Sequence, residues 1–230
     1  MFLTTNLEPQ EDAWGDVIFP PSDLWSKEPP LESDLHRQQM QLLIDCLNCW
    51  WHDRNDFYAS GNLTIYYSPE QIRSRDFRGP DFFVVLATER KLRKSWVVWG
   101  ENGKYPNLIV EILSESTAAI DRGLKKQIYQ DTFRTPDYFW FDPETLEFAG
   151  FHLVDGQYQQ LEANPQGWLW SQQLELYLGI YERQLRFFTS VGQLLLTEGE
   201  SERRQKELAQ QRAERLAAKL RELNFDPDAL

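Results

Sequence analysis

The sequence predicts an α/β protein in which a mixed β-sheet is flanked by helices. Two observations support this fold class: short β-rich runs recur along the chain, and segments with helical periodicity lie between or beside them. The chain has 230 residues, of which 41% are hydrophobic and 14% aromatic. A composition of this kind can bury one core, so we expect a single domain with an appendage.

The N-terminal part of the chain predicts an extended arm followed by a helix. Residues 1–30 contain five prolines, which exclude a regular helix or a central strand, so this segment is expected to lie over the surface. From Leu31 to about Trp51 apolar residues recur at helical spacing, with Ser33 as a possible N-cap; the apolar face would consist of Leu35, Met40, Leu43, Leu47 and Trp50. This helix would open the main domain, residues 31–196.

The predicted strands are short stretches of aliphatic and aromatic residues. They lie at Leu63–Tyr67, Phe82–Leu86, Trp96–Trp99, Leu108–Leu113, Tyr138–Phe141, Phe148–Leu153, Tyr158–Leu161 and Leu185–Phe188. Between two of them, residues 117–133 have helical periodicity, with Ser116 or Thr117 as the cap. The dipeptide Asp155-Gly156 predicts a two-residue hairpin, so the sheet should contain antiparallel pairs.

The composition changes after Thr197, and residues 197–230 are predicted to form a helical extension. Its apolar residues alternate spacings of four and three, as in the seam of a coiled coil: Ala209, Ala213, Leu216, Leu220 and Leu223. Fewer than three full heptads are present. Either a homodimer paired through this helix or a helix folded back on its own domain would satisfy the pattern.

Composition also restricts the class of protein. No apolar run approaches the roughly 18 residues of a membrane span, and the N-terminus lacks a signal pattern, so we expect a cytoplasmic protein without a membrane partner. The two cysteines, Cys46 and Cys49, exclude a disulfide scaffold. We interpret them as buried helix thiols rather than as part of a zinc site with His52.

The net charge of −12 argues against strong constitutive binding to nucleic acid, because basic side chains supply most of the non-specific affinity for phosphates. Residues 71–134 depart from this average, with twelve basic and eight acidic side chains and a net charge of +4. A solvated surface explains this window as well as a nucleic-acid contact does.

Two carboxylates occupy unusual positions in the predicted strands. Asp81 opens the apolar run Phe82–Leu86, and Glu111 interrupts the run Leu108–Leu113. A carboxylate in a strand buried on both faces carries a desolvation cost of several kcal/mol unless a cation compensates for it. If the two acids converge at one end of the sheet, their oxygens would suit a hard cation such as Mg²⁺. A turn cap for Asp81 and a salt bridge to a buried arginine for Glu111 are the alternatives.

The following helix would bring a cation to the same end of the sheet. Asp121, Lys125 and Tyr129 are spaced at i, i+4 and i+8 and therefore share one helical face, whereas Lys126 faces elsewhere. Lys125 could orient an attacking water or offset the charge that develops on a phosphate. An exposed ion pair between Asp121 and Lys125 is the simpler alternative.

Together these motifs resemble the Uma-two family of restriction-endonuclease-like bacterial proteins, within the PD-(D/E)XK nuclease superfamily. The resemblance spans roughly Leu31 to Phe188. It rests on Pro80-Asp81, Val110-Glu111-Ile112-Leu113-Ser114, Thr117, Asp121, Lys125, Tyr129 and the run Pro136 to Pro143. It implies a restriction-endonuclease-like fold in which Asp81 and Glu111 bind Mg²⁺ or Mn²⁺, with nucleic acid, DNA in particular, as substrate.

The chain departs from the superfamily pattern at one position. The strand triplet that should read acid-x-Lys reads Glu111-Ile112-Leu113, and the resemblance implies that Lys125 from the adjoining helix takes the place of the missing lysine. In related families an acid from the first helix often completes the site, and Glu32 or Asp34 is the candidate here.

The sequence therefore predicts a metal-dependent endonuclease with Asp81, Glu111 and Lys125 as catalytic residues and Asp121, Glu32 and Tyr129 in support. The acidic net charge and the missing strand lysine favour an alternative, a nuclease fold without turnover that binds partners and oligomerises. His36, His52 and His152 have no mutual spacing that suggests a site, so no role is assigned to them.

Overall fold

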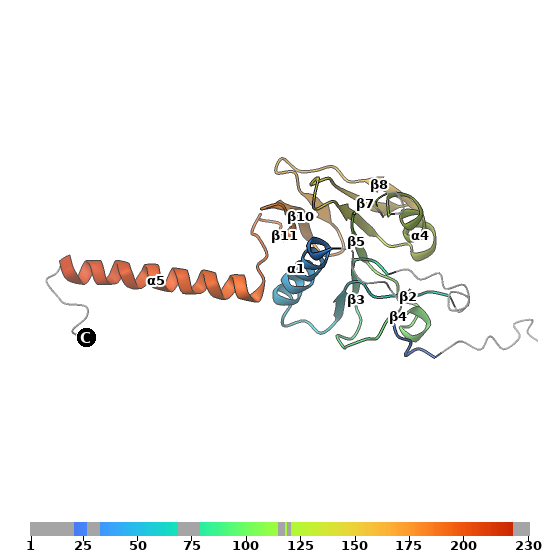
Figure 1. The fold of residues 1–230 in the computed structure, drawn as a ribbon, viewed down its shortest axis with the longest axis horizontal. Coiled ribbons are helices and arrows are strands. Elements are labelled where there is room, and N and C mark those ends of the chain that lie inside the picture. Colours follow the sequence, from blue (N-terminus) through green and yellow to red (C-terminus); the bar gives the residue numbers. More distant parts are fainter. Residues whose placement is uncertain (1–20, 27–32, 69–78, 115–117, 119–120, 223–230) are drawn as a thin grey trace, which may run out of the picture.

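A mixed six-stranded sheet forms the centre of the protein (Figure 1). The computed structural model describes residues 21–26, 33–68, 79–114, 118 and 121–222. In spatial order the strands are β1 (Phe57–Ser60), β3 (Phe82–Leu86), β5 (Leu108–Ile112), β6 (Asp137–Phe141), β7 (Phe148–Val154) and β8 (Gln157–Gln160). β5 and β6 run parallel, and all other neighbours in this sheet are antiparallel.

Smaller elements cover the two faces of this sheet. On one face lie α1 (Asp34–Trp50) and an antiparallel sheet of β9 (Leu169–Ser171), β10 (Leu176–Tyr181) and β11 (Gln184–Phe188). The other face packs against the parallel pair β2 (Ile65–Tyr66) and β4 (Trp96–Val97), and β4 continues into the 3₁₀ turn η1 (Val98–Gly100). A helix of residues 121–133 covers the same face. It consists of η2 (Asp121–Lys125), α4 (Lys126–Ile128) and η3 (Tyr129–Phe133). The predicted fold class, a mixed sheet flanked by helices, is confirmed.

Alternation along the central strands divides the core into two layers. In β3, Phe82 and Val84 face α1, whereas Phe83 and Val85 face the helix of residues 121–133. All four side chains are fully or almost fully buried. Because both faces are covered, the central strands carry nearly continuous apolar runs, and a polar side chain within one of them needs a specific partner.

The first helix begins as predicted, with the Ser33 side chain accepting a hydrogen bond from the His36 amide at 3.2 Å. Its buried face differs from the expected one, because Leu35 and Trp50 are exposed. The residues that it buries include two polar side chains: His36, Gln39, Leu43, Cys46 and Leu47. Gln39 explains part of this difference, since its amide both donates to and accepts from the backbone of Leu185 at 2.9 and 3.0 Å.

The predicted hairpin joins β7 to β8. Val154 pairs with Gln157, so the turn contains only Asp155 and Gly156, whose φ angles are 49° and 83°. Two positive φ values in succession are typical of the type I′ turn, which aspartate followed by glycine adopts readily.

The C-terminal helix α5 (Glu198–Glu222) extends away from the body of the protein (Figure 1). No residue of α5 is buried along its described length, so the folded-back alternative is not what the structure shows. A capping box fixes the start of the helix: the Thr197 hydroxyl accepts from the Glu200 amide at 3.2 Å, and the Glu200 carboxylate accepts from the Thr197 amide at 2.8 Å. The predicted arm, residues 1–30, lies mostly outside the described residues.

Among the described residues, no helix is both long enough and apolar enough to span a membrane.

A buried aspartate connects the two sheets. Asp137 in β6 is fully buried, and its Oδ2 accepts from the Ser171 hydroxyl at 2.6 Å and from the Gln173 amide at 3.0 Å. On its other oxygen, His152 Nδ1 of β7 lies 2.6 Å away. This buried carboxylate therefore satisfies polar groups of β7, β9 and the turn after β9.

We expect Asp137→Ala to lower the free energy of unfolding by about 3 to 5 kcal/mol, because the Ser171 hydroxyl and the Gln173 amide would remain buried without an acceptor. Urea denaturation measures the change. Asp131→Ala, which removes an exposed carboxylate, should stay within about 0.5 kcal/mol of wild type. Equal effects of the two substitutions would contradict the structural role of Asp137.

Candidate functional site

The register of β3 against β5 brings Asp81 and Glu111 together. Phe82 pairs with Val110 in this antiparallel ladder, so Asp81, immediately before β3, lies opposite Glu111 near the end of β5. The Asp81 amide donates to Glu111 Oε2 at 3.4 Å, and Asp81 Oδ2 accepts from the Ile112 amide at 2.8 Å. The two acids are therefore neighbours at one end of the sheet.

The helix of residues 121–133 adds an ammonium group and a phenol. Lys125 Nζ lies 3.1 Å from Glu111 Oε2 and 2.8 Å from Asp121 Oδ1, and the Tyr129 hydroxyl donates to Glu111 Oε1 at 2.6 Å. Asp121, Lys125 and Tyr129 thus share one face, although η2 and η3 are π-helical turns. Lys126 faces elsewhere, with its ammonium over the Phe151 ring.

A histidine of α1 completes the cluster from a third direction. His36 is buried, and its Nε2 lies 3.1 Å from Asp81 Oδ2. No role was predicted for His36, and an acid of this helix, Glu32 or Asp34, was expected in its place. Asp34 is exposed and pairs with Arg37 at 3.0 Å, away from the cluster, and Glu32 lies outside the described residues. A polar residue in helical register with buried Leu43 was the signal that could have identified His36.

Three carboxylates surround one lysine in this cluster. Glu111 and Asp121 are fully buried and Asp81 is largely buried. Burial, together with the neighbouring charges of Asp81 and Asp121, raises the pKa of Glu111 well above its usual range in spite of Lys125. For Asp81 burial acts in the same direction, but the contacts with His36 and Lys125 outweigh it and lower the pKa.

Lys125 remains the charged partner of these acids. Burial alone would lower its pKa, but the charges of Glu111, Asp121 and Asp81 raise it above the ordinary value. The Tyr129 hydroxyl stays protonated, because burial and the adjacent Glu111 raise its pKa well above the usual range. Both groups therefore act at neutral pH as donors toward Glu111.

The composition of the cluster fits a divalent cation. Its available ligands are carboxylate oxygens, which Mg²⁺ and Mn²⁺ prefer, and its acids outnumber its basic groups. Among the residues that the structure describes, no three His, Cys, Asp or Glu side chains are grouped closely enough to hold a metal ion. The predicted metal ligands, Asp81 and Glu111, are two carboxylates only, so waters or substrate would have to supply the remaining ligands of an ion there.

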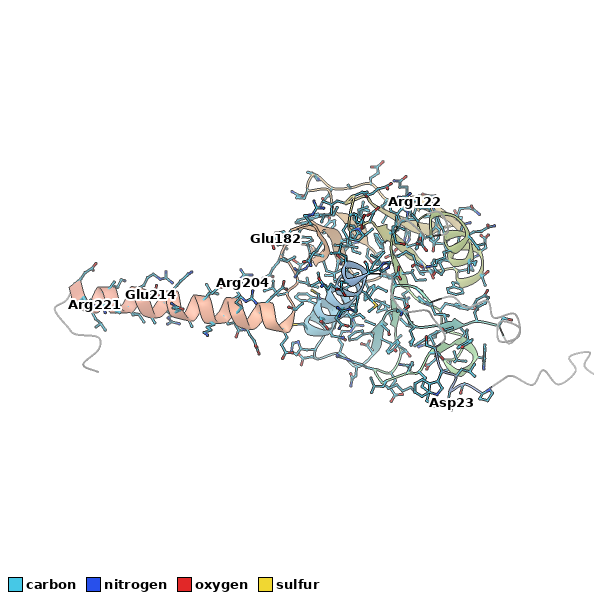
Figure 2. The ribbon with its side chains drawn as sticks, viewed as in Figure 1. Asp23, Arg122, Glu182, Arg204, Glu214 and Arg221 are labelled. Atoms are coloured by element: carbon cyan, nitrogen blue, oxygen red, sulfur yellow. The ribbon has the colours of Figure 1, made fainter. Side chains whose placement is uncertain are left out.

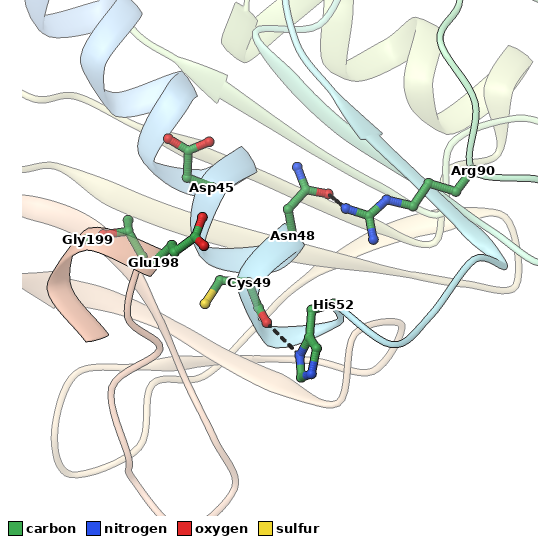
Figure 3. A pocket seen from close by; sticks show the side chains of 8 residues that line it. Asp45, Asn48, Cys49, His52, Arg90, Glu198 and Gly199 are labelled. Atoms are coloured by element: carbon green, nitrogen blue, oxygen red, sulfur yellow. Dashed lines mark hydrogen bonds between the residues drawn. The ribbon is translucent and has the colours of Figure 1, made fainter. Parts of the chain in front are cut away.

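A separate surface pocket of about 660 Å³ lies where α1 ends and α5 begins (Figure 3). It is lined by Asp45, Asn48, Cys49, His52, Arg90, Thr197, Glu198 and Gly199, and includes none of the clustered acids. Cys49 is therefore partly exposed, whereas Cys46 is buried as expected. The His52 ring contacts the Cys49 carbonyl and the Asp53 carboxylate rather than a thiol.

Comparison with known proteins gives a family and a structural relative. The family model Uma2, described as "Putative restriction endonuclease", matches residues 23–186. A crystal structure from Anabaena variabilis ATCC 29413, described as a "putative nuclease belonging to DUF820", is similar, with a TM-score of 0.48 and 14% sequence identity over 66% of this chain and 80% of the other. No curated protein matches the sequence.

We expect Glu111→Gln to raise the melting temperature at about pH 8 and to have less effect near pH 4. Because the folded pKa of Glu111 is raised, the folded state binds its proton more tightly than the unfolded chain does. Stability is therefore lost as the pH rises from the ordinary glutamate pKa through the folded value. Thermal scans across pH measure this, with exposed Glu162→Gln as control. A variant that melts below wild type at high pH would contradict the prediction.

Proposed function

The chain belongs to the Uma2 family, and from this premise we propose that it is a metal-dependent endonuclease that hydrolyses phosphodiester bonds in DNA. The observation that carries the proposal is the convergence of Asp81, Glu111 and Lys125 at one end of β3 and β5. Two carboxylates and one ammonium group in contact are a suitable set for a reaction in which negative charge develops on a phosphate.

We assign Asp81 and Glu111 as ligands of Mg²⁺ or Mn²⁺. When bound, such an ion would lower the pKa of a coordinated water and offset charge on the phosphate. Asp81 is held for this role by two contacts to its Oδ2, the Ile112 amide at 2.8 Å and His36 Nε2 at 3.1 Å. Glu111 is held through Oε1 by the Tyr129 hydroxyl at 2.6 Å.

Lys125 is assigned an electrostatic role. Its raised pKa keeps the ammonium charged, so it cannot accept a proton from water and does not serve as a general base. A charged donor within reach of Glu111 can instead hold a phosphate oxygen or orient a water. Asp121, 2.8 Å away, keeps this side chain directed at the carboxylates.

A second candidate function is a DNA-binding or protein-binding domain that has kept the fold and lost turnover. Complete burial of Glu111 favours it, as does the contact of Lys125 with the oxygen that a cation would use. In that case the three acids and Lys125 would only stabilise the fold.

We expect the purified protein to nick supercoiled plasmid in Mg²⁺ or Mn²⁺ and to be inactive in EDTA. Asp81→Ala should lower the rate at least about 100-fold, because it removes a ligand, and Lys125→Met should do the same by removing the charge near the phosphate. Lys126→Met is the matched control, since that ammonium faces Phe151. Cleavage that persists in EDTA, or equal rates for Lys125→Met and Lys126→Met, would refute the assignment.

We expect His36→Ala to weaken Mn²⁺ binding about 10- to 100-fold, because Asp81 would lose one of the two contacts that orient its Oδ2. Mn²⁺ titration followed by electron paramagnetic resonance measures the affinity without turnover. His36→Gln, whose amide nitrogen can reach a similar position, should restore part of the affinity, and exposed His52→Ala is the control. Unchanged affinity in His36→Ala would remove His36 from the site.

A further inference from the structure

The middle of α5 carries a charge opposite to that of the protein as a whole, although the helix over its full length has seven basic and six acidic side chains, a net charge of +1. The chain carries a net charge of −12, yet residues 203–221 contain seven basic and two acidic side chains, a net charge of +5. This segment is also the part that extends farthest into solvent, and Figure 2 shows Arg204, Glu214 and Arg221 projecting from it. This basic segment on an acidic protein therefore forms a distinct electrostatic surface.

Four of the basic residues form one stripe along this helix: Arg204, Arg212, Arg215 and Lys219. At the α-helical repeat they lie within an arc of about 80° and span about 22 Å along the axis. Glu207 and Glu214 lie at least about 60° outside that arc. Glu222 lies within the arc, just beyond the last basic residue of the stripe. All four basic side chains are exposed.

Most basic residues of the body, unlike those of the stripe, pair with acidic side chains or donate hydrogen bonds to other protein groups. Arg93 pairs with Glu101 at 2.6 Å, Arg122 pairs with Glu147, and Arg90 donates to the Arg54 carbonyl and to Asn48. Within the described part of the chain, by contrast, no carboxylate lies within 4.0 Å of a stripe nitrogen. Arg215 donates through Nε to the Gln211 carbonyl at 3.4 Å, a contact that does not neutralise its charge.

The base of α5 is fixed to the body by a buried arginine. Arg186 in β11 is 3% exposed and donates to both carboxylate oxygens of Glu200, at 3.0 and 2.7 Å, and to the Leu195 carbonyl at 2.9 Å. Glu200 also belongs to the capping box with Thr197. The same carboxylate thus starts the helix and attaches it, so the stripe is presented in a set direction.

We propose that this stripe binds the phosphate backbone of duplex DNA, the substrate of the proposed endonuclease function on which this inference rests. Charge complementarity favours this occupant: the surface is cationic, unpaired and rich in arginine, which binds phosphate oxygens in a bidentate manner. Its length is comparable to the spacing of several successive phosphates along one strand. The net negative charge of the rest of the chain would confine DNA contact to such a surface.

The test is fluorescence anisotropy of a labelled 30-base-pair duplex in EDTA, where binding is measured without cleavage. The stripe variant is Arg212→Gln, Arg215→Gln and Lys219→Gln combined. Its matched control, Arg203→Gln, Lys206→Gln and Arg221→Gln combined, removes the same charge from other faces of α5. We expect the stripe variant to lose affinity at least about 10-fold and to lower the slope of log K against log salt by about 2 to 3, with the control close to wild type.

Equal losses in the two variants, or a wild-type protein that does not bind the duplex, would overturn the proposal. Light scattering tests the rival occupant: if wild type is a dimer and the stripe variant is a monomer, a second copy of the chain covers this face instead. Failure of the endonuclease function gives a different result. A protein that binds DNA through the stripe but nicks no plasmid would refute the endonuclease proposal and leave the DNA-binding proposal standing.

Discussion

The pairing of β3 with β5 is the constraint on which the rest of the site depends. Because Phe82 lies opposite Val110, Asp81 and Glu111 meet at one sheet end and face the helix that carries Lys125 and Tyr129. A slip of one residue in this ladder would move Glu111 to the face covered by α1 and separate it from both partners. The apolar residues on both faces of β3 prevent such a slip, so core packing and site geometry have the same cause.

The excess of buried carboxylates over basic groups connects the geometry of the site to metal binding. A sheet end that buries Asp81, Glu111 and Asp121 beside one lysine is stable only if a proton or a cation offsets the excess negative charge, and the raised pKa of Glu111 expresses that requirement in the protein alone. Family membership supports a nuclease, and under our proposal a divalent ion meets the same requirement. The basic stripe of α5 would then supply the attraction for DNA that the acidic body lacks.

Sequence patterns predicted those helices and strands that form because of their own local residues. β3 and β5 follow from apolar runs, which only Glu111 interrupts, and the shared face of Asp121, Lys125 and Tyr129 follows from helical spacing, although π-helical turns were not expected. β1 and β9 were missed because they are short, and β10 because Gly179 interrupts its apolar run; all three form against their neighbours. His36 was missed for a related reason, since its contact with Asp81 depends on how α1 packs against the sheet. The role of Glu32 stays a prediction outside the described residues.

A crystal of the wild-type protein soaked in Mn²⁺ would show whether Asp81 and Glu111 bind a metal ion, because anomalous scattering locates the ion without reference to activity. We expect one ion in contact with a carboxylate oxygen of Asp81 and one of Glu111, with the Lys125 ammonium moved off Glu111 but still beside the site. A soaked crystal with no ion at these carboxylates, and Lys125 still paired with Glu111, would contradict it.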